Sequence, residues 1–177
     1  VINFEGGRQV YSLAIKAEDQ VAQPLSSSCT VTINVNDLNE GPLLADVALS
    51  VTENSAAGVQ VGSTTMLAVS SDVDAADNVP KALQFSIVPD PVDNVKNSAF
   101  VIEPDTGVIR TTASAIDYEK TPSFALAVRV TDHGDLKADA AVTVTVVDVN
   151  EAPEITEVTP KSVAENTQVG TVFGSAI

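Results

Sequence analysis

The chain has few of the side chains from which redox, zinc or copper sites are built. Its 177 residues include one cysteine, one histidine, one methionine and no tryptophan. Zinc and copper prefer thiolate and imidazole ligands, and Cys29 and His133 lie far apart in the sequence, which argues against either metal. We expect His133 to be a solvated loop residue. Cys29 shares one side of a predicted strand with Val31 and Ile33, so we expect it to be a small buried apolar group, or to pair with a cysteine outside this chain.

Basic residues, aromatic residues and long apolar runs are also scarce. Nine Lys and Arg stand against 24 Asp and Glu, the formal net charge is −15 and aromatics make up 4% of the residues. An acidic chain is repelled by nucleic acid and by anionic membrane surfaces, so we expect neither as a partner. No apolar stretch is long enough to span a bilayer. The abundant valine, threonine and alanine fit a β-rich extracellular protein, and the negative charge favours cations as ligands.

The sequence repeats itself with a period of 111 to 114 residues. Four segments recur in the same order, which indicates a tandem array of one small domain. The matching pairs are residues 2–5 with 116–119, 11–19 with 124–132, 29–42 with 140–153, and 51–54 with 163–166.

This period divides the chain into three parts. We expect residues 1–42 to be the C-terminal part of one repeat, residues 43–153 to be a complete repeat with its linker, and residues 154–177 to begin a third. The third part is too short to bury a core of its own. We therefore expect the chain to be a piece of a longer protein.

Hydrophobic residues alternate with polar ones along the repeat. Val142, Val144 and Val146 point to one side of a predicted strand, and Thr143 and Thr145 point to the other. Turn sequences separate the strands, and no segment has a helical pattern. About seven short strands in about 110 residues predict an all-β, antiparallel Greek-key β-sandwich. The other predicted strands cover 48–52, 82–88, 98–102, 108–112 and 124–130.

The acidic residues of the repeat lie at the ends of these strands. Strand ends gather at the two poles of a sandwich, where acids of successive repeats meet. Two carboxylates about 4 Å apart repel by roughly 4 kcal/mol at an effective dielectric constant near 20. Calcium removes this repulsion, because it binds 6 to 8 oxygen ligands from Asp, Glu, Asn and backbone carbonyls. The pattern therefore favours a calcium site at each joint.

Catalysis is not expected. The sequence contains no Ser, His and acid constellation and no glycine-rich phosphate loop. Pairs of carboxylates could serve glycoside hydrolysis. They recur once per repeat, however, and a catalytic site need not be duplicated at every joint.

Six short motifs together resemble the cadherin family of extracellular repeats. They occur in the order and at the spacing of that family, across nearly the whole chain. The resemblance implies Greek-key β-sandwiches joined end to end with calcium ions between them. The motifs are DLNEGP at 37–42, VTEN at 51–54, DVDAADN at 72–78, IDYE at 116–119, VTDHG at 130–134 and DVNEAP at 148–153.

The resemblance also implies a ligand set for two junctions. Asp37 and Asp148 are expected to orient the linker backbone rather than to bind metal. Asn3 stands where the family pattern has the acid of Asp117, so we expect the outermost calcium of the first junction to be weakened or absent. The first junction would use Glu5, Asn39, Glu40, Asp72, Asp74 and Asp132, with the carbonyls of Leu38, Gly41 and Asn78. The second would use Glu53, Asp117, Glu119, Asn150 and Glu151, with the carbonyls of Val149 and Ala152.

The function implied by the resemblance is that of a calcium-dependent adhesion or recognition ectodomain at the cell surface. Its partners would be the neighbouring repeats and a homophilic or heterophilic surface protein, and the parent could be membrane-anchored. The alternative is a microbial surface adhesin or polysaccharide-binding spacer with the same fold.

Overall fold

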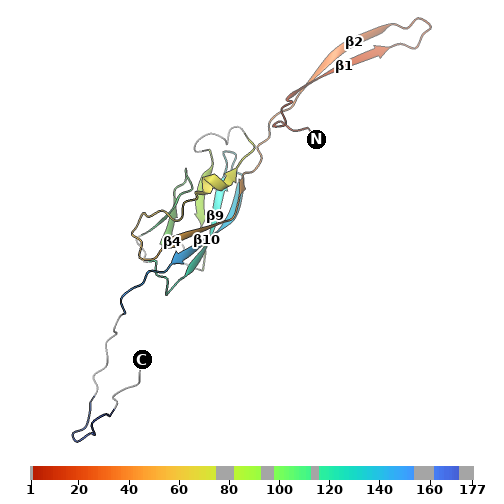
Figure 1. Cartoon of the computed structure of the whole chain (residues 1–177). Coiled ribbons are helices and arrows are strands. Elements are labelled where there is room, and N and C mark those ends of the chain that lie inside the picture. The colour runs from red at the N-terminus through yellow and green to blue at the C-terminus, as the bar shows by residue number, and fades with distance from the viewer. Residues whose placement is uncertain (1, 75–81, 93–97, 113–115, 154–161, 172–177) are drawn as a thin grey trace.

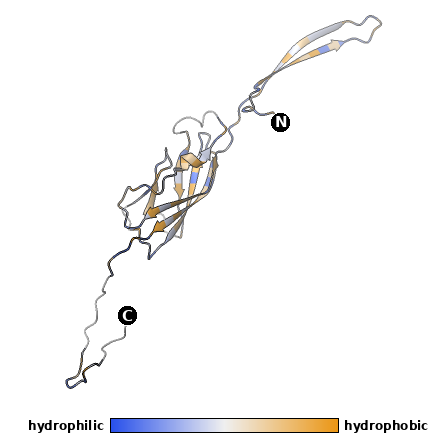
Figure 2. Ribbon diagram, in the orientation of Figure 1, coloured by the Kyte–Doolittle hydropathy of each residue, from blue (hydrophilic) through white to orange (hydrophobic). Residues whose placement is uncertain are grey.

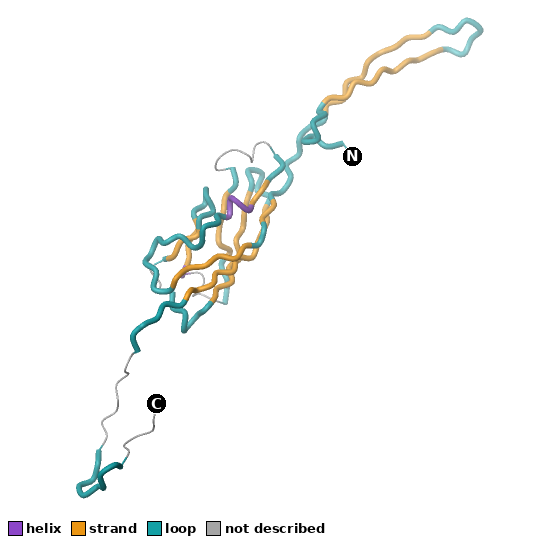
Figure 3. Tube along the Cα trace, viewed as in Figure 1, coloured by secondary structure: helices purple, strands orange, loops and turns teal. Residues whose placement is uncertain are grey.

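The computed structural model contains a β-hairpin and a β-sandwich joined by an extended linker (Figures 1 and 3). Within the described residues, no helix is long and apolar enough to cross a membrane. The description covers the whole chain except residues 1, 75–81, 93–97, 113–115, 154–161 and 172–177.

The hairpin consists of β1 (Val10–Glu18) and β2 (Ser26–Asn34), which pair antiparallel. The register places the apolar residues of both strands on one face, since Leu13 faces Val31 and Ile15 faces Cys29. This face is open: Leu13 is 48% exposed and Ile15 is 50% exposed. Cys29 is exposed as well. The expectation of a buried Cys29 is therefore wrong for this structure, because nothing in the described part of the chain covers its face of the hairpin.

The main sheet of the sandwich has four strands in the order β4-β10-β9-β6. Its strands are β4 (Val47–Thr52), β10 (Lys137–Val147), β9 (Ser123–Thr131) and β6 (Gln84–Val88). β9 pairs antiparallel with both β10 and β6, as the sequence predicts, but β4 pairs parallel with β10. The expectation of purely antiparallel pairing is wrong at this position. The first and last strands of the repeat consequently end at the same pole.

Shorter strands form the other side of the sandwich. β7 (Phe100–Ile102) pairs with β8 (Ile109–Thr111), and β3 (Leu43–Leu44) pairs with β5 (Ser70–Ser71). A single 3-10 turn, η1 (Met66–Val69), precedes β5 and was not expected from the sequence. Its N-cap is Thr65, whose hydroxyl accepts a hydrogen bond from the Ala68 N–H at 3.2 Å.

The core lies between these layers. Val142, Val144 and Val146 of β10 are fully or almost fully buried, as their alternation with threonine predicts. Phe100 of β7 packs edge to face on Phe124 of β9, with ring centroids 5.0 Å apart. Each such buried side chain contributes about 1.5–3 kcal/mol through removal of apolar surface from water. Figure 2 shows apolar residues along the strands of both the sandwich and the hairpin, but only those of the sandwich are enclosed.

Candidate metal centres

The first acidic cluster joins the linker to the sandwich. It consists of Glu5, Asp37, Glu40 and Asp74, which each place a carboxylate oxygen within 4.8 Å of the others. Glu5 precedes the hairpin, Asp37 and Glu40 belong to the linker, and Asp74 follows β5 of the sandwich. Four negative charges from three segments therefore converge where two parts of the molecule meet.

Hydrogen bonds hold the linker against the sandwich at this cluster. The Glu40 N–H donates to Asp74 Oδ2 at 2.9 Å, and Asn39 Nδ2 donates to Asp132 Oδ2 at 2.8 Å. The other oxygen of Asp132 accepts the Leu136 N–H at 2.8 Å. These bonds come from neutral amides, so they position the carboxylates without cancelling their charge.

Two oxygen atoms beside the first cluster have no hydrogen-bond donor. Asn39 Oδ1 and Asp72 Oδ2 are buried and accept no hydrogen bond in the described part of the chain. Buried polar atoms are rarely left in this state. Desolvation, reinforced by the charges of Glu5 and Asp74, raises the pKa of the Glu40 carboxyl above its ordinary value. Unsatisfied oxygens beside converging carboxylates fit a hard divalent cation, which takes oxygen ligands.

The second acidic cluster lies where β4 and β10 end together. It consists of Glu53, Asp117 and Glu119. Glu53 is only 3% exposed, and its carboxylate accepts the Tyr118 N–H at 2.9 Å and the Val149 N–H at 2.6 Å. These two backbone bonds lower the pKa of Glu53, so it is held ionised.

The other two carboxylates of the second cluster have opposite pKa shifts. Asp117 accepts hydrogen bonds from the side chain of Lys120 at 2.6 Å and from its backbone N–H at 2.9 Å, which lower its pKa. For Glu119, a bond from its own backbone N–H lowers the pKa, but desolvation and the charges of Glu53, Glu151 and Asp148 outweigh it. The pKa of Glu119 is therefore raised, first by desolvation and then by repulsion from these acids.

The linker after β10 forms an open hollow beside the second cluster. Asp148 and the four ligand candidates that follow it line this hollow together with Glu119. Glu151 is tied to the sandwich by Asn54, whose Nδ2 donates to Glu151 Oε1 at 2.5 Å. The ligand candidates of this segment are Val149, Asn150, Glu151 and Ala152.

Apart from residues 149–152, which line the hollow beside the second cluster, the sequence-predicted ligands fall into the two clusters and a set of neighbours of the first. Glu5, Glu40 and Asp74 meet in the first cluster, and Glu53, Asp117 and Glu119 meet in the second. Asn39 and Asp132 bond to each other, Asp72 Oδ1 accepts the Asp74 N–H at 3.0 Å, and Leu38 and Gly41 lie in the same linker. Asn78 lies outside the described residues.

One residue of the first cluster was not among the ligands expected from the sequence. Asp37 belongs to the first cluster, although the sequence suggested only a role in the backbone of the linker. His133 is exposed in a turn, as the sequence predicts, and it lines a hollow with Asp37, Asn39 and Asp74. The signal for Asp37 was present: it lies two residues before Asn39, the same spacing that places alternate residues of an extended chain on one side.

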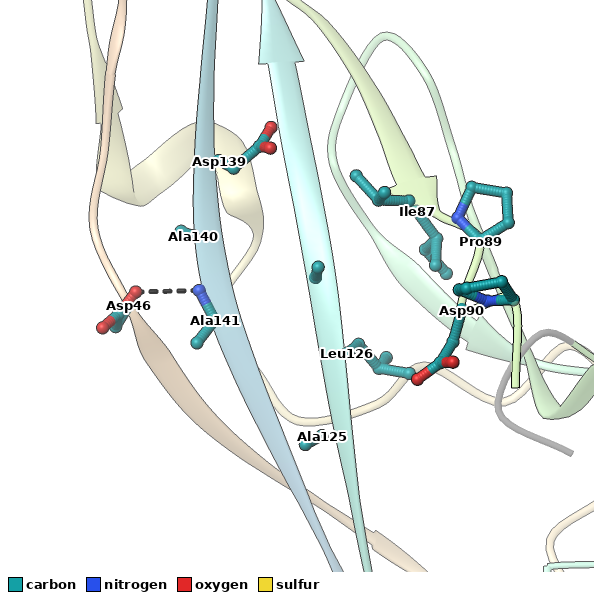
Figure 4. A pocket seen from close by; sticks show the side chains of 12 residues that line it. Asp46, Ile87, Pro89, Asp90, Ala125, Leu126, Asp139, Ala140 and Ala141 are labelled. Atoms are coloured by element: carbon teal, nitrogen blue, oxygen red, sulfur yellow. Dashed lines mark hydrogen bonds between the residues drawn. The ribbon is translucent and has the colours of Figure 1, made fainter. Parts of the chain in front are cut away.

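A separate groove lies on the outer face of the main sheet (Figure 4). Small side chains, those of Ala125, Ala127 and Ala141, form part of its lining. Asp46 Oδ1 accepts the Ala141 N–H at 2.8 Å, and Asp139 forms two hydrogen bonds with Arg129 at 2.7 Å. Because Asp46 already binds a backbone N–H and Asp139 already binds Arg129, the groove is less suited to a cation than either acidic cluster.

Comparison with known proteins places this arrangement in a family. The Cadherin domain model matches residues 48–148, which include almost all of the main sheet and all three residues of the second cluster. The chain belongs to the cadherin family. This confirms the family resemblance and the predicted all-β sandwich.

The relatives are long cadherins and protocadherins. The chain is 32% identical over 151 residues to Neural-cadherin of Drosophila melanogaster, covering 83% of this chain and 5% of that protein. It is 30% identical over 167 residues to Protocadherin Fat 4 of Homo sapiens, covering 92% of this chain and 3% of that protein. The chain thus spans a small fraction of the length of these relatives.

Solved cadherin structures share its fold. The protocadherin gammaB7 EC3-6 cis-dimer structure matches with a TM-score of 0.62 and 29% identity, over 83% of this chain and 35% of that one. Mouse Cadherin-23 EC22-24 matches with a TM-score of 0.60 and 27% identity, over 84% and 45%. Cadherin domains are adhesion modules and not enzymes, and this membership implies an extracellular or cell-surface setting.

Proposed function

We propose that this cadherin chain is a segment of a cell adhesion or recognition ectodomain in which calcium ions stiffen the joints between repeats. The supporting observation is the presence of one acidic cluster at each end of a single sandwich: the first combines residues of the linker and of the sandwich, and the second lies beside the linker that follows β10. A cation bound at such a cluster links two parts of the rod through shared ligands.

Calcium is the cation that suits both clusters. The ligand candidates supply carboxylate, amide and carbonyl oxygens in irregular arrangements, which calcium tolerates and magnesium does not. Without an ion, the carboxylates repel one another and the linker is free to swing away. With an ion, the repulsion becomes attraction and the joint stiffens.

The first junction would bind calcium through ligands from three segments: the one before the hairpin, the linker, and the sandwich. The side-chain oxygens of Asn39 and Asp72, which accept no hydrogen bond, are candidates for ligands of this calcium ion. We add Asp37 to the ligand candidates because of its place in the cluster. Asn3 accepts a hydrogen bond from the Gly6 N–H at 3.0 Å, a local turn contact that agrees with a weaker or missing outermost ion. The proposed ligands from the sequence are Glu5, Leu38, Asn39, Glu40, Gly41, Asp72, Asp74, Asn78 and Asp132.

The second junction would bind calcium through residues of the sandwich and of the linker that follows it. Glu53 and Asp117 are held ionised by hydrogen bonds. Binding would also relieve the repulsion around Glu119. The proposed ligands are Glu53, Asp117, Glu119, Val149, Asn150, Glu151 and Ala152.

The hairpin supports the proposed division of the chain into repeats at residues 42 and 153. The hairpin face that carries Leu13 and Val31 corresponds to the face of β9 and β10 that is buried in the sandwich. We propose that β1 and β2 belong to an adjacent repeat whose other strands cover this face. Neighbouring repeats of the same chain are then the first partners, and a homophilic or heterophilic surface protein the second. The relatives named above are animal proteins, so they do not favour the microbial spacer alternative.

Calcium binding can be tested on the full chain by calorimetry, thermal unfolding and small-angle scattering, with calcium and with chelator. We expect calcium to raise the melting temperature and to narrow the distribution of interatomic distances. Asp74→Asn should weaken binding at the first junction. Glu18→Gln, which removes a carboxylate from the hairpin outside both clusters, should not. The absence of binding heat together with an unchanged melting temperature would refute the proposal.

A further inference from the structure

Asn54 follows Glu53 at the end of β4 and turns the chain away from the sheet. Its φ of 57° lies in the left-handed region, which asparagine adopts more readily than most residues. The Asn54 N–H donates to the Ile116 carbonyl at 2.9 Å, and the Ser55 hydroxyl donates to the Thr52 carbonyl at 2.6 Å. The backbone around Asn54 is thus fixed on both sides of the residue.

The side chain of Asn54 reaches a residue 97 positions later. Its Nδ2 donates to Glu151 Oε1 at 2.5 Å. This contact is possible because β4 and β10 run parallel and Thr52 lies opposite Val147, so the segments that follow them continue from the same pole. Glu151 is exposed and follows the last strand. In the part of the chain that the structure describes, this bond is what ties its side chain to the sandwich.

The chemistry of the contact suits a cation site. The charge of Glu151 contributes to the raised pKa of Glu119, so the two carboxylates repel each other. A lysine at position 54 would hold Glu151 but would add a positive charge that competes with a metal ion. A neutral amide holds the carboxylate and leaves its charge for the ion.

We propose that Asn54 is a positioning residue that keeps Glu151 beside the second cluster, ready for calcium, through its side-chain amide. The inference rests on the proposed calcium function of that cluster. Asn54 itself is not a ligand. The sequence repeats the arrangement, because Asn166 follows Glu165 and has a φ of 65°.

Three variants of the full chain distinguish the effect of the Asn54 side-chain amide from the effect of the turn around it. Asn54→Gly removes the amide and tolerates the left-handed conformation. Ser55→Ala removes a hydrogen bond of the same turn but keeps the amide. Asn166→Gly makes the same substitution in the other Glu-Asn unit. Melting temperatures of all three in chelator show whether each variant remains folded.

The test is an NMR titration that follows each junction through its own backbone amides. In chelator, Asn54→Gly should increase the mobility of residues 149–152, whereas Ser55→Ala and Asn166→Gly should not. With calcium, Asn54→Gly should raise the dissociation constant at the second cluster about 10-fold, the scale found for residues that orient metal ligands, and leave the first cluster unchanged.

Two results would overturn the inference in different ways. If Asn54→Gly changes neither the mobility of Glu151 nor the calcium affinity, Asn54 serves only the turn and the positioning role is wrong. If the wild-type chain shows no calcium response at residues 148–152, the proposed calcium function of this cluster fails, whatever the variant does in chelator.

Discussion

At the scale of the residue, neutral amides hold several carboxylates in and beside the clusters in place. Asn39 binds Asp132, and two backbone N–H groups bind Glu53. Lys120 pairs with Asp117 and partly compensates the charge of that one acid. The acids therefore keep most of their negative charge, and small changes around the amides should affect metal binding.

Gly134 provides a test of the Asn39 position. A Cβ atom at residue 134 would lie 2.6 Å from Cγ, Nδ2 and Oδ1 of Asn39. Gly134→Ala should push Asn39 away from Asp132 and reduce calcium affinity at the first junction by about 10-fold or more. Calorimetry would measure the change.

Gly41→Ala is the matched control for this substitution. Its Cβ would meet the Leu136 side chain at 3.7 Å, an ordinary contact, and the Gly41 carbonyl would remain. Equal affinities for the two variants would contradict the role assigned to Asn39.

Glu53 should make the stability of the sandwich depend on pH. Because hydrogen bonds lower its pKa in the folded state, its stabilising contribution is complete above the unfolded-state pKa, near 4.5. It is lost as the pH falls through the lower folded-state value. In chelator, Glu53→Gln should therefore destabilise the chain at pH 7, and the difference from wild type should shrink below about pH 4. Urea unfolding at both pH values measures this, and a difference that does not depend on pH would contradict it.

At the scale of the element, the parallel pairing of β4 with β10 places Glu53 of the second cluster beside the linker that follows β10. Glu53 follows β4 and Val149 follows β10, and their hydrogen bond joins the two strand ends. The hairpin strands β1 and β2 differ from the strands of the sandwich in burial. They have the same alternation as β9 and β10, but their apolar face is not enclosed.

A pair of equivalent substitutions should distinguish the two strand pairs. Val144 of β10 is 0% exposed, whereas Ile33, its counterpart 111 residues earlier, is 43% exposed. Val144→Asp buries an unpaired charge and should cost more than about 4 kcal/mol, enough to unfold the sandwich. Ile33→Asp should leave the melting of the sandwich unchanged. Circular dichroism and thermal unfolding would check both, and unfolding of the sandwich by Ile33→Asp would mean that the hairpin packs against it.

At the scale of the whole molecule, the charge distribution makes the stability of both ends of the sandwich depend on the ions in solution. The net charge is −15, and the acidic clusters lie at opposite poles. Without calcium, the repulsion within each cluster opposes the folded arrangement. Salt screens exposed charges, since the Debye length falls from about 10 Å at 0.1 M to about 3 Å at 1 M.

Sodium chloride should therefore partly replace the effect of calcium on the stability of the chain, but not its effect on the stiffness of the joints. In chelator, 1 M salt should raise the melting temperature by a few degrees, because it weakens the repulsion. The scattering profile should still report flexible joints, because monovalent ions do not bridge the linker to the sandwich. The calcium-loaded chain is the control and should respond less. An equal rise in both states would show that the effect does not arise from the clusters.

The sequence by itself determined the strands, the repeat and most of the ligand candidates. Alternating Val and Thr along residues 142–146 predict one buried and one exposed face, because side chains of a strand alternate between its two faces. The strands predicted at 48–52, 82–88, 98–102, 108–112 and 124–130 lie within two residues of the observed ones, whereas β10 begins five residues before the predicted alternation at 142–146. Acids at strand ends predicted the two clusters, since strand ends gather at the poles of a sandwich.

Only the tertiary structure decided which of these residues meet. The parallel register of β4 and β10, the bond between Asn54 and Glu151, and the place of Asp37 in the first cluster all depend on segments far apart in the sequence. Alternation gives the face of a strand but not its neighbour or its direction. For the same reason, the sequence could not show that Cys29 is exposed: burial requires a second layer, and the pattern of one strand does not supply it.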